Sequence, residues 1–181
     1  IKPNIRELEN FIKAGALSFT KLKKTEQMLI GRMALKGVDY KTYQADNDFS
    51  VSENIKNELK LLDMAITGHP LKILSRLPVC VPVNKVNKYA GKDVRVAGFV
   101  AAYRCAVTKK KEYMKFVSIM DETGILECVL FPEVYKKFGK ETRDCGLLSV
   151  FGTIQNDYDK ITLIVKSVEK IGNSGDDSNA I

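Results

Sequence analysis

The chain has little of what a metal site or a disulfide framework requires. It holds a single histidine, and its four cysteines are isolated, with no Cys-x-x-Cys pair. Structural zinc sites are built from such pairs or from mixed Cys/His clusters. We therefore expect no metal, no cofactor, and free thiols in a reducing cytoplasm. His69 stands beside a Gly/Pro helix stop, with no acid or nucleophile spaced to it, and is interpreted as a structural hydrogen-bonding residue. The cysteines are Cys80, Cys105, Cys128 and Cys145.

Long apolar runs are also missing. No stretch approaches the roughly 20 apolar residues of a transmembrane helix, and no basic-then-apolar leader opens the chain. We therefore expect no membrane partner. The first residue is Ile1 rather than methionine, so we expect either a fragment of a longer polypeptide or a trimmed chain.

Positive charge is in modest excess, with a formal net charge of +7. Residues 1–90 hold 15 basic and 9 acidic side chains, residues 91–172 hold 14 and 11, and residues 173–181 hold 0 and 2. Such an excess suits a polyanion partner, although a solvated lysine face produces the same excess. The length and the apolar fraction of 45% fit one medium domain or two small ones.

Residues 91–171 predict five short strands. Apolar and polar residues alternate over residues 94–100, as in a strand with one face on a core. Gly98 falls on the inward face, where a glycine lets a strand coil or another backbone approach closely. A helical turn is expected over residues 133–138, between the third and fourth strands. The first predicted strand contains the alternating residues 94–100 and continues to Tyr103; the other four cover residues 114–120, 125–131, 147–154 and 161–168.

The turns between these strands fit a small closed barrel. Asp121 can cap a tight turn after the second strand, and Gly124 can supply a positive φ there. Cys128 is expected to be a small buried apolar residue. Five strands with a helix between the third and fourth are typical of the oligonucleotide-binding (OB) fold, in which the first and last hairpin loops grip the ligand. The sequence thus predicts an α+β protein, with an N-terminal helical domain followed by a five-stranded OB-fold barrel.

Helical periodicity characterises the N-terminal part. An apolar stripe predicts a first helix that ends at Gly15, placed as a left-handed cap. A second helix is expected over residues 25–36, with Thr25 as its N-cap. A third is expected from Ser52, with an apolar stripe that possibly includes Ile66.

Two segments of this part are polar. A basic turn between the first two helices carries Lys21, Lys23 and Lys24. The start of a helix favours anions, so these lysines are interpreted either as a phosphate contact or as a solvated loop. Residues 38–51 are predicted to be an exposed linker. The predicted divisions are residues 1–75 (helical domain), 76–90 (connector), 91–172 (barrel) and 173–181 (disordered tail).

Three sequence blocks, in order, carry a family resemblance. They are L-E-N-F-I-K-A-G-A at residues 8–16, N-E-L-K-L-L-D-M-A-I-T-G-H-P-L at residues 57–71, and the turn and strand at residues 121–135. The first resembles the "L-E-x-L-I-x-A-G-A" that follows the helix-hairpin-helix element in the alpha subunit of bacterial replicative DNA polymerase III. The second is similar to that family's "E-x-L-G-x-x-x-S-G-H-P-L", with Asp63 at its usual glycine and Thr67 at its serine. The third looks like its barrel signature.

The resemblance implies the DNA-handling C-terminal region of such a subunit, which binds single-stranded DNA and primed template. Polymerisation needs two metal ions held by paired carboxylates, and no such acidic cluster is present, so no catalytic residue is assigned. Residues 44–49 stand where such subunits carry a peptide that docks into the sliding clamp. Gln44 and Phe49 are present, but Asn47 and Asp48 replace the aliphatic anchor.

Candidate DNA contacts are cations and aromatic rings, because single strands bind such barrels through phosphate neutralisation and base stacking. The candidates lie on the outward phase of the first strand, in the two hairpin loops, and in the basic turn. Phe99 could instead pack against the helical domain. The predicted contacts are Arg95, Phe99, Tyr103, Lys109, Lys110, Lys111, Tyr158, Lys160, Lys21, Lys23 and Lys24.

Two other function classes stay open. The barrel could be a protein dock that joins a polymerase to sliding clamp or clamp-loader subunits, since fold alone does not define function. It could also be a tRNA-binding barrel like those appended to aminoacyl-tRNA synthetases, which the helical part does not suit. Salt dependence separates DNA binding from apolar peptide docking, because only the former releases many counterions.

Overall fold

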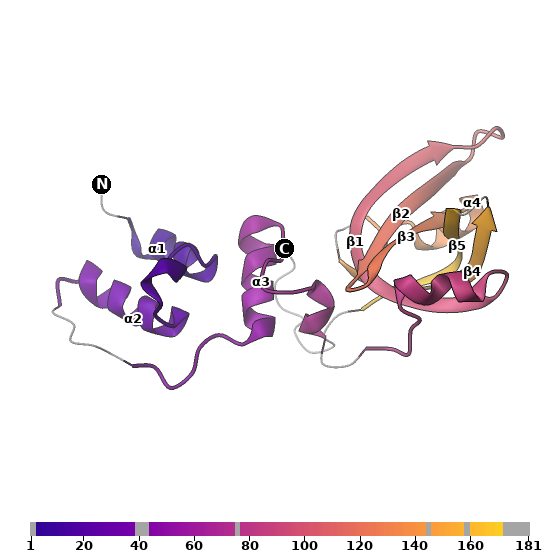
Figure 1. The fold of residues 1–181 in the computed structure, drawn as a ribbon. Coiled ribbons are helices and arrows are strands. Elements are labelled where there is room, and N and C mark those ends of the chain that lie inside the picture. Colours follow the sequence, from indigo (N-terminus) through magenta and orange to yellow (C-terminus); the bar gives the residue numbers. More distant parts are fainter. Residues whose placement is uncertain (1–2, 39–43, 75–76, 144–145, 158–159, 172–181) are drawn as a thin grey trace. The chain divides into compact units, whose positions relative to one another are not determined.

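The computed structural model describes residues 3–38, 44–74, 77–143, 146–157 and 160–171, and they form two compact units. The first unit is Ile1–Ile73 and the second is Leu74–Ile181 (Figure 1). Among the described helices, none has the length and apolar character needed to cross a membrane. The predicted tail and Tyr158 lie outside the described residues.

The first unit is helical. Its core includes Ile12 and Ile55, which are almost completely buried. Gly15 and Gly37 follow the first two helices with φ of 81° and 71°, which confirms the predicted glycine stop at Gly15. The elements are α1 (Ile5–Lys13), η1 (Ser18–Thr20), α2 (Lys24–Leu35), α3 (Val51–Leu62) and η2 (Pro70–Ile73).

Helix boundaries in this unit differ from the predicted ones in two places. Helix α2 begins at Lys24, so Thr25 lies inside the helix and its hydroxyl donates to the carbonyl of Asn47 at 2.8 Å. Helix α3 begins one residue earlier than predicted because Ser50 forms the capping box. It ends at Leu62, because Asp63 takes a left-handed conformation with φ of 55°.

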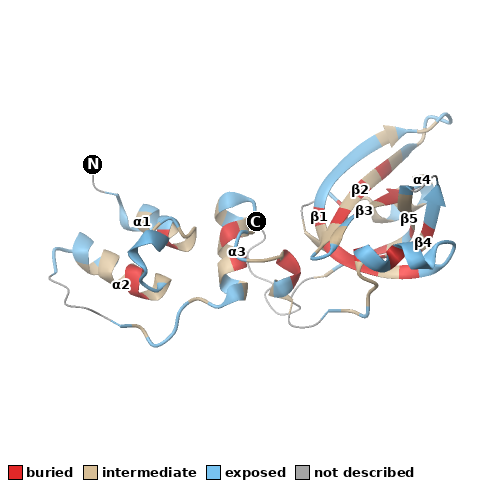
Figure 2. Cartoon of the chain, in the orientation of Figure 1, coloured by how far each residue is buried: buried red, intermediate tan, exposed pale blue. Residues whose placement is uncertain are grey.

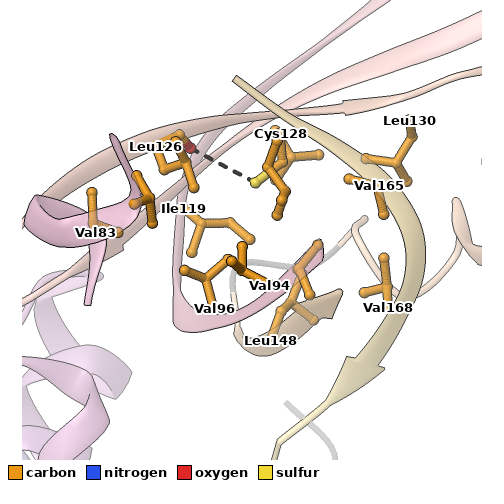
Figure 3. Packing of buried hydrophobic residues seen from close by; sticks show 14 of the residues in the cluster. Val83, Val94, Val96, Ile119, Leu126, Cys128, Leu130, Leu148, Val165 and Val168 are labelled. Carbon is orange, nitrogen blue, oxygen red and sulfur yellow. Dashed lines mark hydrogen bonds between the residues drawn. The ribbon is translucent and has the colours of Figure 1, made fainter. Parts of the chain in front are cut away.

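The second unit is a closed five-stranded barrel, as predicted. The strand order is β1-β2-β3-β5-β4, and all neighbouring pairs are antiparallel except β3 and β5. Side chains from every strand meet in one core, and Figure 3 shows Cys128 buried among valine, leucine and isoleucine side chains. Alternation of apolar residues therefore located the core face correctly. The elements are β1 (Asp93–Val107), β2 (Tyr113–Asp121), β3 (Gly124–Leu130), α4 (Pro132–Phe138), β4 (Leu147–Asp157) and β5 (Lys160–Lys170).

The predicted connector is partly built into the barrel. Residues Val83–Tyr89 form the 3-10 helix η3, whose Val83 and Val86 belong to the barrel core. The Asp121 carboxylate accepts a hydrogen bond from the Val83 N–H at 2.8 Å and also caps the β2–β3 turn. The division between units falls at Ile73 and Leu74, so η3 belongs to the barrel unit rather than to a linker.

Strand β1 extends well beyond the alternating residues 94–100, to Val107. Residues 93–99 pair with β4, and residues 99–107 pair with β2, so that β1 and β2 extend together as an arm beyond the other strands (Figure 1). The outer part of β1 in this arm is exposed (Figure 2). The placement of Tyr103 on this strand is confirmed, because the pairing with β2 continues past Val100, where the apolar alternation stops.

Two glycines of the barrel, Gly98 and Gly124, lie close to neighbouring residues, so a side chain at either position would be crowded. A Cβ on Gly98 would lie 2.3 Å from the Ile119 side chain and 2.6 Å from the Met120 carbonyl oxygen, which confirms the predicted close backbone approach. Gly124 does not have the positive φ expected of it. A Cβ there would lie 3.2 Å from Val83, so its role is to admit η3 against the turn.

Candidate nucleic-acid interface

A β-bulge in β1 decides which side chains face outward on the arm. The register against β2 shifts between Val100 and Ala102, so Ala101 is an extra residue. Phe99 pairs with Met120, and beyond the bulge Arg104 pairs with Phe116. Residues 116 and 120 of β2 share a face, because alternate residues of a strand do. Arg104 therefore lies on the same outer face as Phe99.

Tyr103 lies on the opposite face of the arm, which corrects its predicted place beside Arg95 and Phe99. It pairs with Val117, a residue of the barrel interior. The Nζ of Lys115 lies 3.8 Å from the centroid of the Tyr103 ring. The same ammonium donates to the Thr142 carbonyl at 2.6 Å. The physical reason is the bulge, which reverses the phase of every β1 residue that follows it.

Arg104 is the centre of a charged cluster on the outer face. Its guanidinium lies over the Phe116 ring at 3.7 Å from the ring centroid. It also lies 3.4 Å from Glu127 of β3, and Lys160 of β5 contacts the other oxygen of Glu127 at 2.7 Å. We name these residues, Arg104, Phe116, Glu127 and Lys160, the outer-face cluster.

Glu127 holds two cations in place on this face. The hydrogen bond from Lys160, together with the charges of Lys160 and Arg104, keeps the pKa of Glu127 below its usual value. The carboxylate is only 23% exposed, whereas Arg104 and Lys160 are 63% and 66% exposed. Exposed ion pairs contribute little to stability. Two positive side chains are therefore oriented by one carboxylate and still face solvent.

An apolar path accompanies the cluster. Phe99 and Met120 are half-buried on this face, and Ile125 of β3, which pairs with Met120, is 63% exposed. Because bases stack on aromatic rings, Phe99 is the candidate stacking residue of this path, and Met120 and Ile125 offer apolar contact beside it. The alternative interpretation of Phe99, packing against the helical domain, stays untested.

The turn of the arm presents the three predicted lysines to solvent. The Thr108 N–H donates to the Glu112 carbonyl at 2.8 Å, and Lys111 has φ of 61°. Lys109, Lys110 and Lys111 are all exposed. The turn therefore adds three cations at the end of the arm that carries Arg104.

Arg95 lies apart from the outer-face cluster. It pairs with Phe151 of β4, and its guanidinium donates to Ser149 and to Glu169, each at 2.9 Å. It is thus engaged by β4 and β5, away from the arm, although it keeps the outward phase predicted for it. Its role in binding nucleic acid stays a prediction.

The basic turn before α2 already has protein partners. The Lys23 ammonium donates to the Ala45 carbonyl at 2.6 Å, and the Lys24 ammonium donates to Asn54 at 2.6 Å. The α2 N-terminus is occupied as well, because Asp48 accepts from the Lys24 N–H at 2.9 Å. A phosphate contact was one of the two roles open for this helix start, and the start is covered by the Asp48 carboxylate of the chain. Lys21 is exposed, with φ of 60°.

Residues 44–49, which stand at the position of the clamp peptide, are hydrogen-bonded to α2. Besides Asp48, the Ala45 N–H donates to Glu26 at 3.0 Å. Gln44 is exposed and Phe49 is half-buried. The described residues 44–50 lie outside any helix or strand and most are exposed, as predicted, but hydrogen bonds hold the segment against α2. Clamp binding by Gln44 and Phe49 stays a prediction.

Metal-ligating residues do not gather in the part of the chain that the structure describes. No group of three His, Cys, Asp or Glu side chains there could hold a metal ion. Cys80, Cys105 and Cys128 are free thiols, and burial raises the pKa of the Cys128 thiol. His69 accepts a hydrogen bond from the Leu71 N–H at 3.2 Å. The outward cations and aromatic rings of the barrel are thus its most distinctive chemistry.

Comparisons with known proteins agree with this architecture. Residues 94–171 match the family described as an OB-fold nucleic acid binding domain. DNA polymerase III subunit alpha of Aquifex aeolicus is 27% identical over 176 residues, covering 92% of this chain and 15% of that protein. The error-prone DNA polymerase of Rhodopirellula baltica is 32% identical over 127 residues, covering 67% of this chain and 11% of that protein.

Solved structures also match part of the chain. The asparaginyl-tRNA synthetase from Pyrococcus horikoshii, complexed with asparaginyl-adenylate, is 25% identical with a TM-score of 0.41, covering 52% of this chain and 23% of that chain. That score is too low to bear on function. The chain spans 15% and 11% of the two polymerase relatives named above. Over nearly its whole length, it is homologous to a segment of bacterial DNA polymerase III alpha subunits, and this segment contains an OB-fold domain.

Proposed function

We propose that the barrel binds single-stranded DNA across the outer face of β1, β2 and β3, as a DNA-handling segment of a replicative or error-prone DNA polymerase. The names of the homologous proteins and the nucleic-acid-binding family of the barrel support a role in DNA replication. Single-stranded DNA and primed template are the proposed partners.

The observation that carries this proposal is the arrangement of Arg104. Its guanidinium is stacked on Phe116 and held by Glu127, which also orients Lys160. Arginine and lysine neutralise phosphates, while aromatic faces support bases, and both kinds of group lie on one exposed face. The exposed lysines of the arm turn extend the positive surface along the path that a strand would follow.

Catalysis is proposed to lie elsewhere in the longer polymerase. On the outer face, the Glu127 carboxylate is already paired with two cations, Arg104 and Lys160. Nucleotide transfer requires carboxylates that hold metal ions. We therefore expect no extension of a primed template by this chain alone in a single-turnover assay, and measurable extension would contradict this part of the proposal.

The test is a fluorescence-anisotropy titration of the full chain with a labelled oligothymidine, at two salt concentrations. Arg104→Gln is expected to weaken binding about tenfold, since a stacking or charged contact contributes about 1–3 kcal/mol. Arg32→Gln is the matched control, because Arg32 is also an exposed arginine paired with a glutamate, Glu9. The control should bind as the wild type does.

Unchanged binding by Arg104→Gln would refute the proposed face. A wild-type chain that ignores DNA, yet binds clamp or clamp-loader subunits with little salt dependence, would favour the protein dock instead.

A further inference from the structure

A second basic feature lies on the other side of the arm. A groove of about 420 Å³ separates the start of β2 from the C-terminal part of α4 and the residues that follow it. Its lining includes two tyrosines, Tyr113 and Tyr135. We name it the α4 groove. Its cations are Lys111, Lys136, Lys140 and Arg143.

The groove is on the opposite face of the arm from the outer-face cluster. Tyr113 and Lys115 alternate with Met114 and Phe116 along β2, so Tyr113 points to the Lys115 side of the strand. Arg104 pairs with Phe116 on the other side. The two basic surfaces are therefore separated by the thickness of one β-ribbon and meet at its turn.

A buried bond joins the two walls of the groove. Lys115 of β2 is 3% exposed, and its ammonium donates to the Thr142 carbonyl at 2.6 Å. Thr142 is 1% exposed, and its hydroxyl donates to the carbonyl of Gly139 at 3.0 Å. The residues after α4 are thus fixed against the arm, and the groove is a formed feature of the fold.

The charge of the lining is strongly positive. Its one carboxylate is Glu112, whose nearest cationic partner is Lys136 at 3.5 Å. The side chains of Lys136, Lys140 and Arg143 are exposed. A groove with four cations, one carboxylate and two tyrosines suits phosphate groups that are joined to flat bases.

We propose that the α4 groove binds the continuation of the single strand after it crosses the arm turn. This inference rests on the proposed function and extends it, because the outer face alone would engage only a short segment. Lys111 belongs both to the turn and to the groove lining. A phosphate backbone that follows the exposed turn lysines therefore passes from one basic surface to the other.

The length of the bound strand provides the test. We would titrate the full chain with oligothymidines of about 6 and about 20 nucleotides, since OB folds occupy roughly 4–16 nucleotides. The groove variant is Lys136→Gln/Lys140→Gln/Arg143→Gln. The matched control is Lys85→Gln/Lys88→Gln/Lys92→Gln, which removes three exposed cations outside the groove. Inorganic phosphate and a deoxynucleoside triphosphate serve as free-anion competitors.

The groove variant should bind the short oligonucleotide as the wild type does. It should bind the long one at least about tenfold more weakly at low salt, with a salt slope smaller by about 2, since each phosphate contact on a single strand contributes about 0.7. Glu112→Gln should strengthen binding of the long oligonucleotide, because it removes the negative charge of the lining. The control and the free anions should have little effect.

Wild-type affinity and slope for the long oligonucleotide in the groove variant would overturn the inference. Equal weakening by the groove variant and its control would also overturn it, since the effect would then be one of net charge. Failure of the proposed function would give a different result from failure of this inference. In that case Arg104→Gln would bind the short oligonucleotide with wild-type affinity.

Discussion

The Asp121 carboxylate is the site at which a single substitution should most clearly loosen the barrel. One of its oxygens accepts from the Thr123 N–H at 2.7 Å, the Thr123 hydroxyl at 2.7 Å and the Gly124 N–H at 3.0 Å. The other accepts from the Val83 N–H at 2.8 Å. In Asp121→Asn the first set can survive, but the amide NH₂ would face the Val83 N–H. The bond to η3 is therefore lost.

The expected cost of Asp121→Asn at neutral pH is about 2–3 kcal/mol, the upper range for a hydrogen bond to a charged group that leaves its donor without an acceptor. Urea unfolding of the full chain, followed by circular dichroism of the strands, measures this cost. Asp46→Asn, which removes an exposed carboxylate in the helical unit, is the control and should unfold as the wild type does. A loss below about 0.5 kcal/mol in Asp121→Asn would refute the reasoning.

Acid provides a second check on the same carboxylate. Burial alone would raise the pKa of Asp121, but the hydrogen bonds from Thr123, Val83 and Gly124 outweigh it and lower the pKa. A depressed folded-state pKa stabilises the fold above the unfolded pKa of about 3.9, and this stability is lost as pH falls through the folded value. The difference between wild type and Asp121→Asn should therefore shrink below about pH 4. A difference that is constant with pH would contradict the assignment.

Three further predictions concern stability and binding. Gly98→Ala should destabilise the barrel by about 1–3 kcal/mol in urea unfolding, because the new Cβ would clash with the Met120 carbonyl. An unchanged unfolding midpoint would contradict this, since it would mean that strand β2 shifts to accommodate the methyl group. Asp63→Gly should raise stability by roughly 0.5–1 kcal/mol, since φ there is 55°, and a loss would mean that the side chain has a role of its own. Replacing Lys109, Lys110 and Lys111 by alanine should weaken single-strand binding at low salt and reduce the slope of log affinity against log salt concentration by about 2. Titration curves identical to those of the wild type would show that the turn does not contact DNA.

The barrel could be predicted from the sequence because its signals are local. Period-two alternation marks the core face of each strand, and the inward Gly98 anticipated a close approach that the structure confirms. Helix stops at left-handed glycines were equally visible. The capping of α3 by Ser50 was missed because Ser52, two residues later, offers a similar signal.

Part of the candidate interface, namely Arg104, Phe116 and Glu127, could not be predicted. The bulge at Ala101 depends on pairing with β2, which the β1 sequence does not reveal, and it moves Tyr103 off the outer face and Arg104 onto it. Glu127 was not singled out because its partners, Arg104 and Lys160, come from strands that only the closed barrel brings together. The prediction carried the outward phase of Arg95 and Phe99 on to Tyr103, which places Arg104 on the opposite face when the bulge is not known.

Long-range bonds also changed the interpretation of the polar segments. Asp48 and Glu26 tie residues 45–48 to the start of α2, a contact that neither segment reveals by itself. A polar, non-periodic stretch that connects two helices thus also caps the start of one of them.

The most direct test of the central claim is chemical-shift mapping of the ¹⁵N-labelled full chain during titration with an oligothymidine. The account predicts the largest shifts at the backbone amides of Phe99, Arg104, Phe116 and Glu127, together with the Arg104 side-chain Nε–H. Smaller shifts are expected at the arm turn. Shifts confined to η3 or to the helical unit, with the Arg104 Nε–H unmoved at saturation, would contradict the outer face as the DNA-binding surface.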